Sequence, residues 1–180
     1  MALIRLNNQS ISSVTALPSA VQGLPMVDMW RMDTNTAHSS GAQVLSSNWE
    51  RADAYNYGNI GSAMTQSSGV FTFPETGIYF CSSSVVFEAD ASQTYIEVRM
   101  QTSTDSGSVF DTSSQAWGGT HNTNGGTNEY TTINNSFVFD VQNASTYRLR
   151  LQTNNAIAST ILANTNIQRT GIIFIKLGNT

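Results

Sequence analysis

The sequence is poor in cysteine, lysine, proline and charged residues. Its 180 residues include one cysteine (Cys81), one lysine (Lys176) and three prolines, and only 11% are Asp, Glu, Lys or Arg. A single cysteine excludes an internal disulfide framework and any zinc site built from several cysteines. With 8 basic and 12 acidic residues, the chain cannot form the basic surface that binds a phosphate backbone, so we expect no nucleic-acid partner.

Long apolar runs and enzyme motifs are missing as well. No stretch approaches the ~20 apolar residues of a membrane helix, and the start of the chain does not look like a signal peptide. We therefore expect neither membrane association nor export by a signal peptide. The sequence also contains no Gly-x-Ser-x-Gly elbow, no phosphate-binding glycine-rich loop and no His-Glu-x-x-His pair. We expect no cofactor, no metal and no enzymatic activity.

Five side chains could in principle bind a metal or act as a nucleophile, but a structural role explains each of them more simply. His38 and His121 lie in loop-like sequence without a second ligand at metal-binding spacing, so each is predicted to be solvated. Asp105 and Asp111 flank a Ser/Gly stretch that would suit calcium, but capping of their own turns is the favoured interpretation. Cys81 lies in a strand pattern and is predicted to be a buried thiol.

Neutral polar and apolar residues make up most of the chain. Ser, Thr, Asn and Gln account for 71 of the 180 residues, and 39% are hydrophobic, including 8 Phe, 6 Tyr and 3 Trp. That apolar fraction excludes a disordered chain. Helix-favouring residues are scarce, whereas Thr, Val, Ile and aromatic residues are common, so the composition predicts an all-β domain.

Alternating apolar and polar residues mark the expected strands. The alternation is clean in residues 95–101, 137–141 and 147–152, and the last two are joined by a stretch of hairpin length. Residues 102–128 are predicted to be a polar, glycine-rich loop with a short strand inside it. Further strands are expected at 29–33, 54–57, 70–73 and 78–88.

Residues 78–87 and 171–177 are apolar on both faces, so both faces must be covered. At about 25 cal/mol per Å², leaving Ile172 and Phe174 in water would forfeit several kcal/mol. Contact with another subunit is the economical explanation. Folding of residues 1–25 over the strand within one chain is nearly as simple.

The first residues differ in character from the rest, because they contain scattered aliphatic side chains and no aromatic one. We interpret 1–26 as an extended N-terminal arm that contacts a particle or neighbouring subunits, and 27–180 as the folded domain. The predicted anchors of the arm are Leu3, Ile4, Leu6, Ile11 and Leu17.

Two segments resemble a known family. Residues 69–80 read Gly-Val-Phe-Thr-Phe-Pro-Glu-Thr-Gly-Ile-Tyr-Phe, and residues 170–175 place a glycine before large apolar residues. Both are similar to strands of the complement globular-head and tumour necrosis factor superfamily. The resemblance implies a two-sheet antiparallel jelly-roll sandwich that packs as a homotrimer and does not catalyse. The candidate trimer-interface residues, some of which are expected to be core instead, are Tyr79, Phe80, Ile172, Phe174 and Ile175.

The first 25 residues, and the richness in Ser, Thr, Asn and Gly with very little Lys, resemble small virion proteins of tailed bacteriophages. This resemblance implies a non-enzymatic structural virion protein. It would be a homotrimeric capsid decoration (cement) protein, or a tail-associated protein, in contact with major capsid or tail proteins.

Two other functions stay open. A receptor-binding head of a tail fibre would recognise host surface glycans through the polar loop, with Trp117 and His121 as candidate ligand residues. A glycan hydrolase would need two carboxylates in one cleft, and the sequence places no two of the twelve together.

Overall fold

The computed structural model describes residues 23–121 and 128–180, which form strands and connecting turns. None of these described residues belongs to a helix long and apolar enough to cross a membrane. The strands are β1 (Met26–Met32), β2 (Thr36–His38), β3 (Gly41–Val44), β4 (Trp49–Arg51), β5 (Thr65–Ser67), β6 (Val70–Thr72), β7 (Gly77–Ala89), β8 (Gln93–Ser103), β9 (Asp111–Thr120), β10 (Glu129–Val141), β11 (Arg148–Asn155), β12 (Ser159–Ile161) and β13 (Gly171–Gly178).

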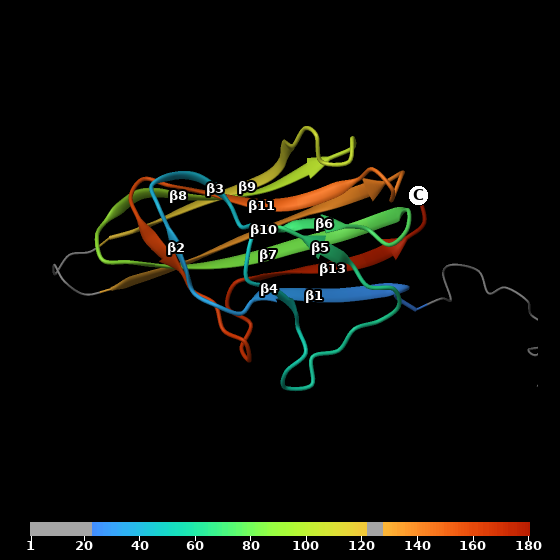
Figure 1. The fold of residues 1–180 in the computed structure, drawn as a ribbon, viewed down its shortest axis with the longest axis horizontal. Helices are drawn as coiled ribbons and strands as arrows, with labels where there is room; N and C mark the ends of the chain where they lie inside the picture. Colours follow the sequence, from blue (N-terminus) through green and yellow to red (C-terminus); the bar gives the residue numbers. More distant parts are fainter. Residues whose placement is uncertain (1–22, 122–127) are drawn as a thin grey trace, which may run out of the picture.

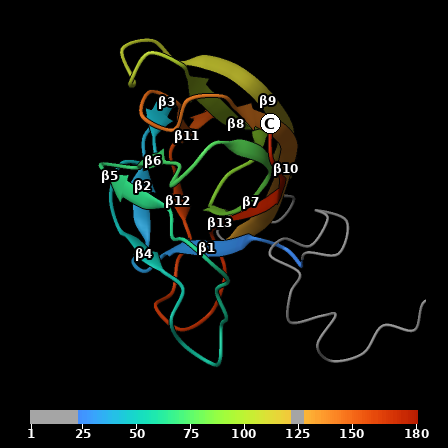
Figure 2. The ribbon, with the colours of Figure 1, turned by 90° about the vertical axis from the view of Figure 1, so that its right-hand side faces the viewer.

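The strands form two sheets that pack face to face (Figure 1). The seven-stranded sheet has the order β2-β12-β7-β13-β1-β4, and β10 pairs with the other side of β7. The six-stranded sheet has the order β5-β6-β11-β8-β9, and β3 pairs with part of β11. Figure 2 looks along the sandwich, where β9 and β10 lie together at one side of the two layers. The predicted all-β sandwich of two antiparallel sheets is confirmed.

The core lies between the sheets and is filled by every second residue of the long strands. On β7 the inward side chains include Tyr79, Cys81 and Phe87, none of which is exposed to solvent. Aromatic rings link the two layers, since the ring of Phe71 lies 5.2 Å from that of Phe174 between ring centroids. Alternation of this kind is what a strand needs when one face meets a second sheet.

The segment that joins β10 to β11 is not a hairpin, contrary to the prediction. Strand β10 pairs along its whole length with β7, whereas β11 pairs with β8, β6 and β3 in the other sheet. The chain therefore crosses from one layer to the other, and Phe139 and Tyr147 stack at the crossing with centroids 5.6 Å apart. Alternation identifies the buried face of a strand but not its partner, which is why the sequence pattern misled us.

Two further expectations need correction. The predicted strand at 54–57 is a turn, because Tyr55 and Asn56 have φ values of 51° and 63°, in the left-handed region that strands do not use. The short strand expected inside the predicted loop at 102–128 is longer than predicted, since β9 runs for 10 residues there. Strand β9 is the last strand of the six-stranded sheet and most of its side chains are exposed or half-buried, so its sequence shows only weak apolar alternation.

Both ends of the described chain lie at one end of the domain. Met26 pairs with Lys176, so the described start of the chain and the C-terminus lie at the same end of the sandwich (Figure 1). The arm that the sequence predicts is therefore attached at this end. Its proposed anchors lie outside the described residues.

Truncation of a core aromatic tests this arrangement. Phe174→Ala is expected to lower the free energy of unfolding by about 3–5 kcal/mol, because it removes a fully buried ring that contacts Phe71 and Phe73. Ile175→Ala, on the other face of the same strand, is the control and is expected to cost less than half as much in the isolated subunit. Urea denaturation measures both, and equal losses would contradict the assigned inward face.

Candidate functional site

The outward face of the seven-stranded sheet carries an apolar row. Ladder pairing places Val138 beside Phe80, Phe80 beside Ile175, and Ile175 beside Val27, so these four side chains cross four neighbouring strands. Val138 is 58% exposed and the other three are half-buried. Within the described part of the chain, an outward apolar row of this length is unusual on the surface of a monomer.

The neighbouring row of outward side chains is apolar only on β13 and β1. Ser82 pairs with Ile173, and Ile173 pairs with Met29. Both apolar side chains are half-buried and border a shallow hollow of about 200 Å³ whose floor includes Ser82 and Ser84. We call Val27, Met29, Phe80, Val138, Ile173 and Ile175 the apolar patch.

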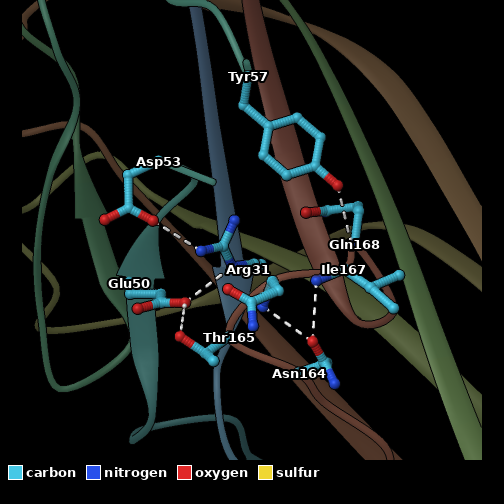
Figure 3. A network of polar contacts seen from close by, with 9 residues as sticks. Arg31, Glu50, Asp53, Tyr57, Asn164, Thr165, Ile167 and Gln168 are labelled. Carbon is cyan, nitrogen blue, oxygen red and sulfur yellow. Dashed lines mark hydrogen bonds and ion pairs between the residues drawn. The ribbon is translucent and has the colours of Figure 1, made fainter. Parts of the chain in front are cut away.

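A polar network lies on the same face, beside the apolar patch (Figure 3). The Arg31 side chain is completely buried, and it donates from Nε to Glu50 and from Nη2 to Asp53, each at 2.7 Å. Its guanidinium carbon lies 5.6 Å from the centre of the Tyr57 ring, and the Tyr57 hydroxyl accepts from the backbone NH of Gln168 at 3.1 Å. The network therefore holds the loop that contains Asp53 and Tyr57, and the loop that contains Gln168, beside the apolar patch.

The outward face of the six-stranded sheet has the opposite chemistry. Arg99 donates to both carboxylate oxygens of Glu97, at 2.8 and 2.6 Å, and to Gln152 at 3.2 Å. Gln101 donates to the same oxygen of Gln152 at 3.3 Å and accepts from Nε of Arg150 at 2.8 Å. We call these five residues the polar lattice. Its groups satisfy one another, so this face needs no partner to be stable in water.

Only part of the predicted trimer interface faces outward. Tyr79, Ile172 and Phe174 are at most 1% exposed and belong to the core, so assigning them to contacts between subunits is wrong. Because successive side chains of a strand point to opposite faces, the true outward residues are their neighbours. Phe80 and Ile175 do lie in the apolar patch, and their role in assembly stays a prediction.

Sequence reasoning missed four members of the patch, Val27, Met29, Val138 and Ile173. The sequence did contain a sign of them, because Ile173 and Ile175 are two residues apart, as are Val27 and Met29, and residues at this spacing share one face of a strand. Which strands lie side by side could not be read from the pattern, and that adjacency is what makes the patch continuous.

The two candidate ligand residues are separate from the patch. Trp117 stands on β9, not in a loop, and is 58% exposed. His121 is exposed and is the last described residue before residues 122–127, which the structure does not describe. A role in glycan binding stays a prediction for both.

His38 is buried, so its prediction as a solvated histidine is wrong. Nδ1 contacts the carbonyl oxygen of Ser39 and Nε2 contacts the Thr153 hydroxyl. A carbonyl oxygen only accepts, so Nδ1 carries the proton and Nε2 accepts from Thr153. Burial lowers the pKa of His38 below its ordinary value. The ring forms one wall of a hollow of about 420 Å³ between β2 and β3.

Cys81 and Asp105, the other side chains considered as reactive or metal-binding groups, are held in contacts that stabilise the fold. Burial raises the pKa of the Cys81 thiol, as expected of the buried thiol that was predicted. Asp105 accepts from the Ser103 hydroxyl and the Val109 backbone NH, and these bonds lower its pKa. In residues 23–121 and 128–180, no three His, Cys, Asp or Glu side chains form a group that could hold a metal ion.

Comparisons with known proteins show the fold. No family model and no curated protein matches the sequence. Among solved structures, the Eiger tumour necrosis factor of S. frugiperda is similar with a TM-score of 0.67 and 13% identity, over 87% of this chain and 95% of that one. Murine APRIL at pH 8.5 is similar with a TM-score of 0.58 and 16% identity, over 84% and 98%. The predicted tumour-necrosis-factor-like jelly roll is confirmed; identities this low say nothing more.

Protonation of His38 is expected to destabilise the fold. Because the folded pKa lies below the unfolded one, stability is complete above about pH 6.5 and falls as the pH drops below it, by at most about 1.4 kcal/mol per pH unit. His38→Gln should remove this part of the pH dependence, whereas His121→Gln should not. Urea denaturation between pH 7.5 and about 5 measures it, and identical slopes in the two variants would contradict the assignment.

Proposed function

We propose that this chain is a non-enzymatic assembly protein that forms a homotrimer through the apolar patch. The observation that carries the proposal is the outward-facing apolar row Val138, Phe80, Ile175 and Val27. Burying such side chains contributes about 25 cal/mol per Å² of apolar surface, and the two rows of the patch contain no charge that would have to be desolvated. The similarity in fold to Eiger and APRIL agrees with a binding or assembly role.

The position of the patch favours contact between copies of this chain. It lies towards the end of the sheet where Met26 pairs with Lys176, next to loops that the Arg31 network holds in place, so residues 23–121 and 128–180 leave one defined area open. The centre of the opposite face is polar and internally bonded, and its exposed aromatic residues Tyr95 and Trp117 lie to one side of that centre. A ring of three copies closes when the patches meet around a threefold axis, so that one edge of each patch packs against a different edge of the next.

We further propose that the trimer is a structural component of a bacteriophage virion, as a capsid decoration (cement) protein or a tail-associated protein. Support comes from the likeness of the first 25 residues to small virion proteins and from the neutral polar composition. Short hydroxyl and amide groups can bond to neighbouring coat proteins without the desolvation cost of ions. The described chain begins beside its C-terminus, so the arm would contact the particle at this end.

A charge in the apolar row is expected to break the trimer. Multi-angle light scattering should give the mass of three copies for the unaltered protein and of one copy for Val138→Asp. Val138 is exposed on the isolated subunit, so its replacement should leave the fold intact. The control is Val109→Asp, since Val109 is 59% exposed on a different surface, and this variant should stay trimeric. A monomeric or dimeric native protein, or a trimeric Val138→Asp variant, would contradict the proposal.

Removal of the arm tests the virion role separately. The full chain is expected to co-sediment with virions of its own phage, whereas the protein lacking residues 1–25 should lose most of this association and remain trimeric. Electron microscopy of the particle would locate the protein. Absence of the chain from virions, or equal binding without the arm, would refute the particle role and leave the trimer unaffected.

A further inference from the structure

The guanidinium group of Arg150 is held in a fixed orientation on the outward face of the six-stranded sheet. Its guanidinium carbon lies 3.9 Å from the centre of the Phe110 ring, and Nε donates to Gln101 at 2.8 Å. Nη1 and Nη2 have no hydrogen-bond partner among the described residues, and the side chain is half-buried. A guanidinium fixed on a ring and at one nitrogen offers its outer edge to a carboxylate, which can accept two parallel hydrogen bonds there.

The charges around Arg150 favour an anionic ligand. Arg148 and Arg99 project from the same face, and Glu97 is the one carboxylate in the polar lattice, where it is already paired with Arg99. The carboxylate of Asp105 is turned into its own loop by bonds to Ser103 and Val109. Arg150 itself is in no ion pair with a carboxylate of residues 23–121 and 128–180, so its positive charge is available to an anion on a chain whose net charge is −4.

Trp117 provides a flat apolar platform at the other corner of the same face. It pairs with Glu97 on the neighbouring strand, so both side chains lie on the outward side, and it is 58% exposed. At about 3.3 Å per residue and about 4.8 Å between strands, Trp117 and Arg150 lie about 16 Å apart. A ligand that uses both must be an extended chain and not a single small ring.

Between these two points the surface is polar and fixed. Gln152 and Arg99, both half-buried, are held by hydrogen bonds to each other, and the buried Gln101 also donates to Gln152, so the amide of Gln152 and the guanidinium of Arg99 are already in place for a ligand. A protein partner normally requires an apolar centre in the interface, which this face lacks. A sugar chain instead combines hydroxyl groups for the lattice with flat ring faces for an indole.

We propose that the outward face of the six-stranded sheet binds an acidic oligosaccharide. One carboxylate of the sugar chain bonds to Nη1 and Nη2 of Arg150, the hydroxyl groups of intervening sugars bond to the lattice, and another sugar ring stacks on Trp117. The site lies on the sheet opposite the apolar patch, so it does not depend on the proposed trimer.

Calorimetry with hexagalacturonate tests this site, with its fully methyl-esterified form as the uncharged counterpart. The acid is expected to bind at least ten times more tightly than the ester, and its affinity should fall as salt is raised. Arg150→Gln and Trp117→Ala should each weaken binding at least tenfold. Arg150→Lys keeps the charge but loses the two-pronged geometry, and it should also weaken binding severalfold. Arg169→Gln, which removes an exposed positive charge outside the site, is the control and should bind as the native protein does.

Several results would overturn the proposal. These are equal affinity for the acid and the ester, no binding of either, native affinity in Arg150→Gln or Arg150→Lys, or equal binding of a poly-glutamate peptide, which would identify an acidic protein partner instead. Circular dichroism and light scattering on every variant show that it is folded and whether it is trimeric. Loss of sugar binding in a trimeric variant is thus distinguished from failure of assembly.

Discussion

Strand β7 is the element on which the rest of the structure depends. It is 13 residues long, pairs with β10 along its whole length, and pairs with β13 and β12 on its other edge. Its inward side chains, including Tyr79 and Phe87, fill the core, while Phe80 on its outward side joins the apolar patch. A central strand that is apolar on both sides must have something on both sides, and one sandwich supplies only the inner cover.

The buried charge of Arg31 decides how much of the outer face the chain covers for itself. A guanidinium with no solvent exposure is stable only when it is paired, and Glu50 and Asp53 provide the partners. Asp28, equally buried, is paired with Arg51 at 2.6 Å and also accepts from the Met64 backbone NH at 2.8 Å. The bonds of Arg31 hold the segment after β4 on the outward face, whereas those of Asp28 lie on the inward face, where Asp28 stands opposite Phe174 in the ladder.

The sequence was sufficient for the fold class but not for the surfaces. Alternation in residues 95–101 and 147–152 correctly identified two half-buried strands, and they pair with each other as β8 and β11. The apolar run at 171–177 predicted cover on both faces, and the structure shows the inner one; run composition does not say which face is inside, and Phe174 was assigned to the wrong one. Burial of His38 could not be anticipated, because its partner Thr153 lies 115 residues away in the chain. The order of strands in a sheet, the connections between the two sheets and contacts between distant residues depend on the whole fold, and a local sequence pattern does not predict them.

The scarcity of charge acquires a physical meaning from where the charges lie. Four of the eight basic residues, Arg31, Arg51, Arg99 and Lys176, are held in ion pairs within the described chain. Ionic groups are thereby kept out of the apolar rows, where each would oppose the packing of a second copy. The guanidinium edge of Arg150 instead faces outward on the opposite sheet. Because the two surfaces lie on opposite layers of one sandwich, assembly through the first leaves the second open to a ligand, and three copies would present three such faces at once.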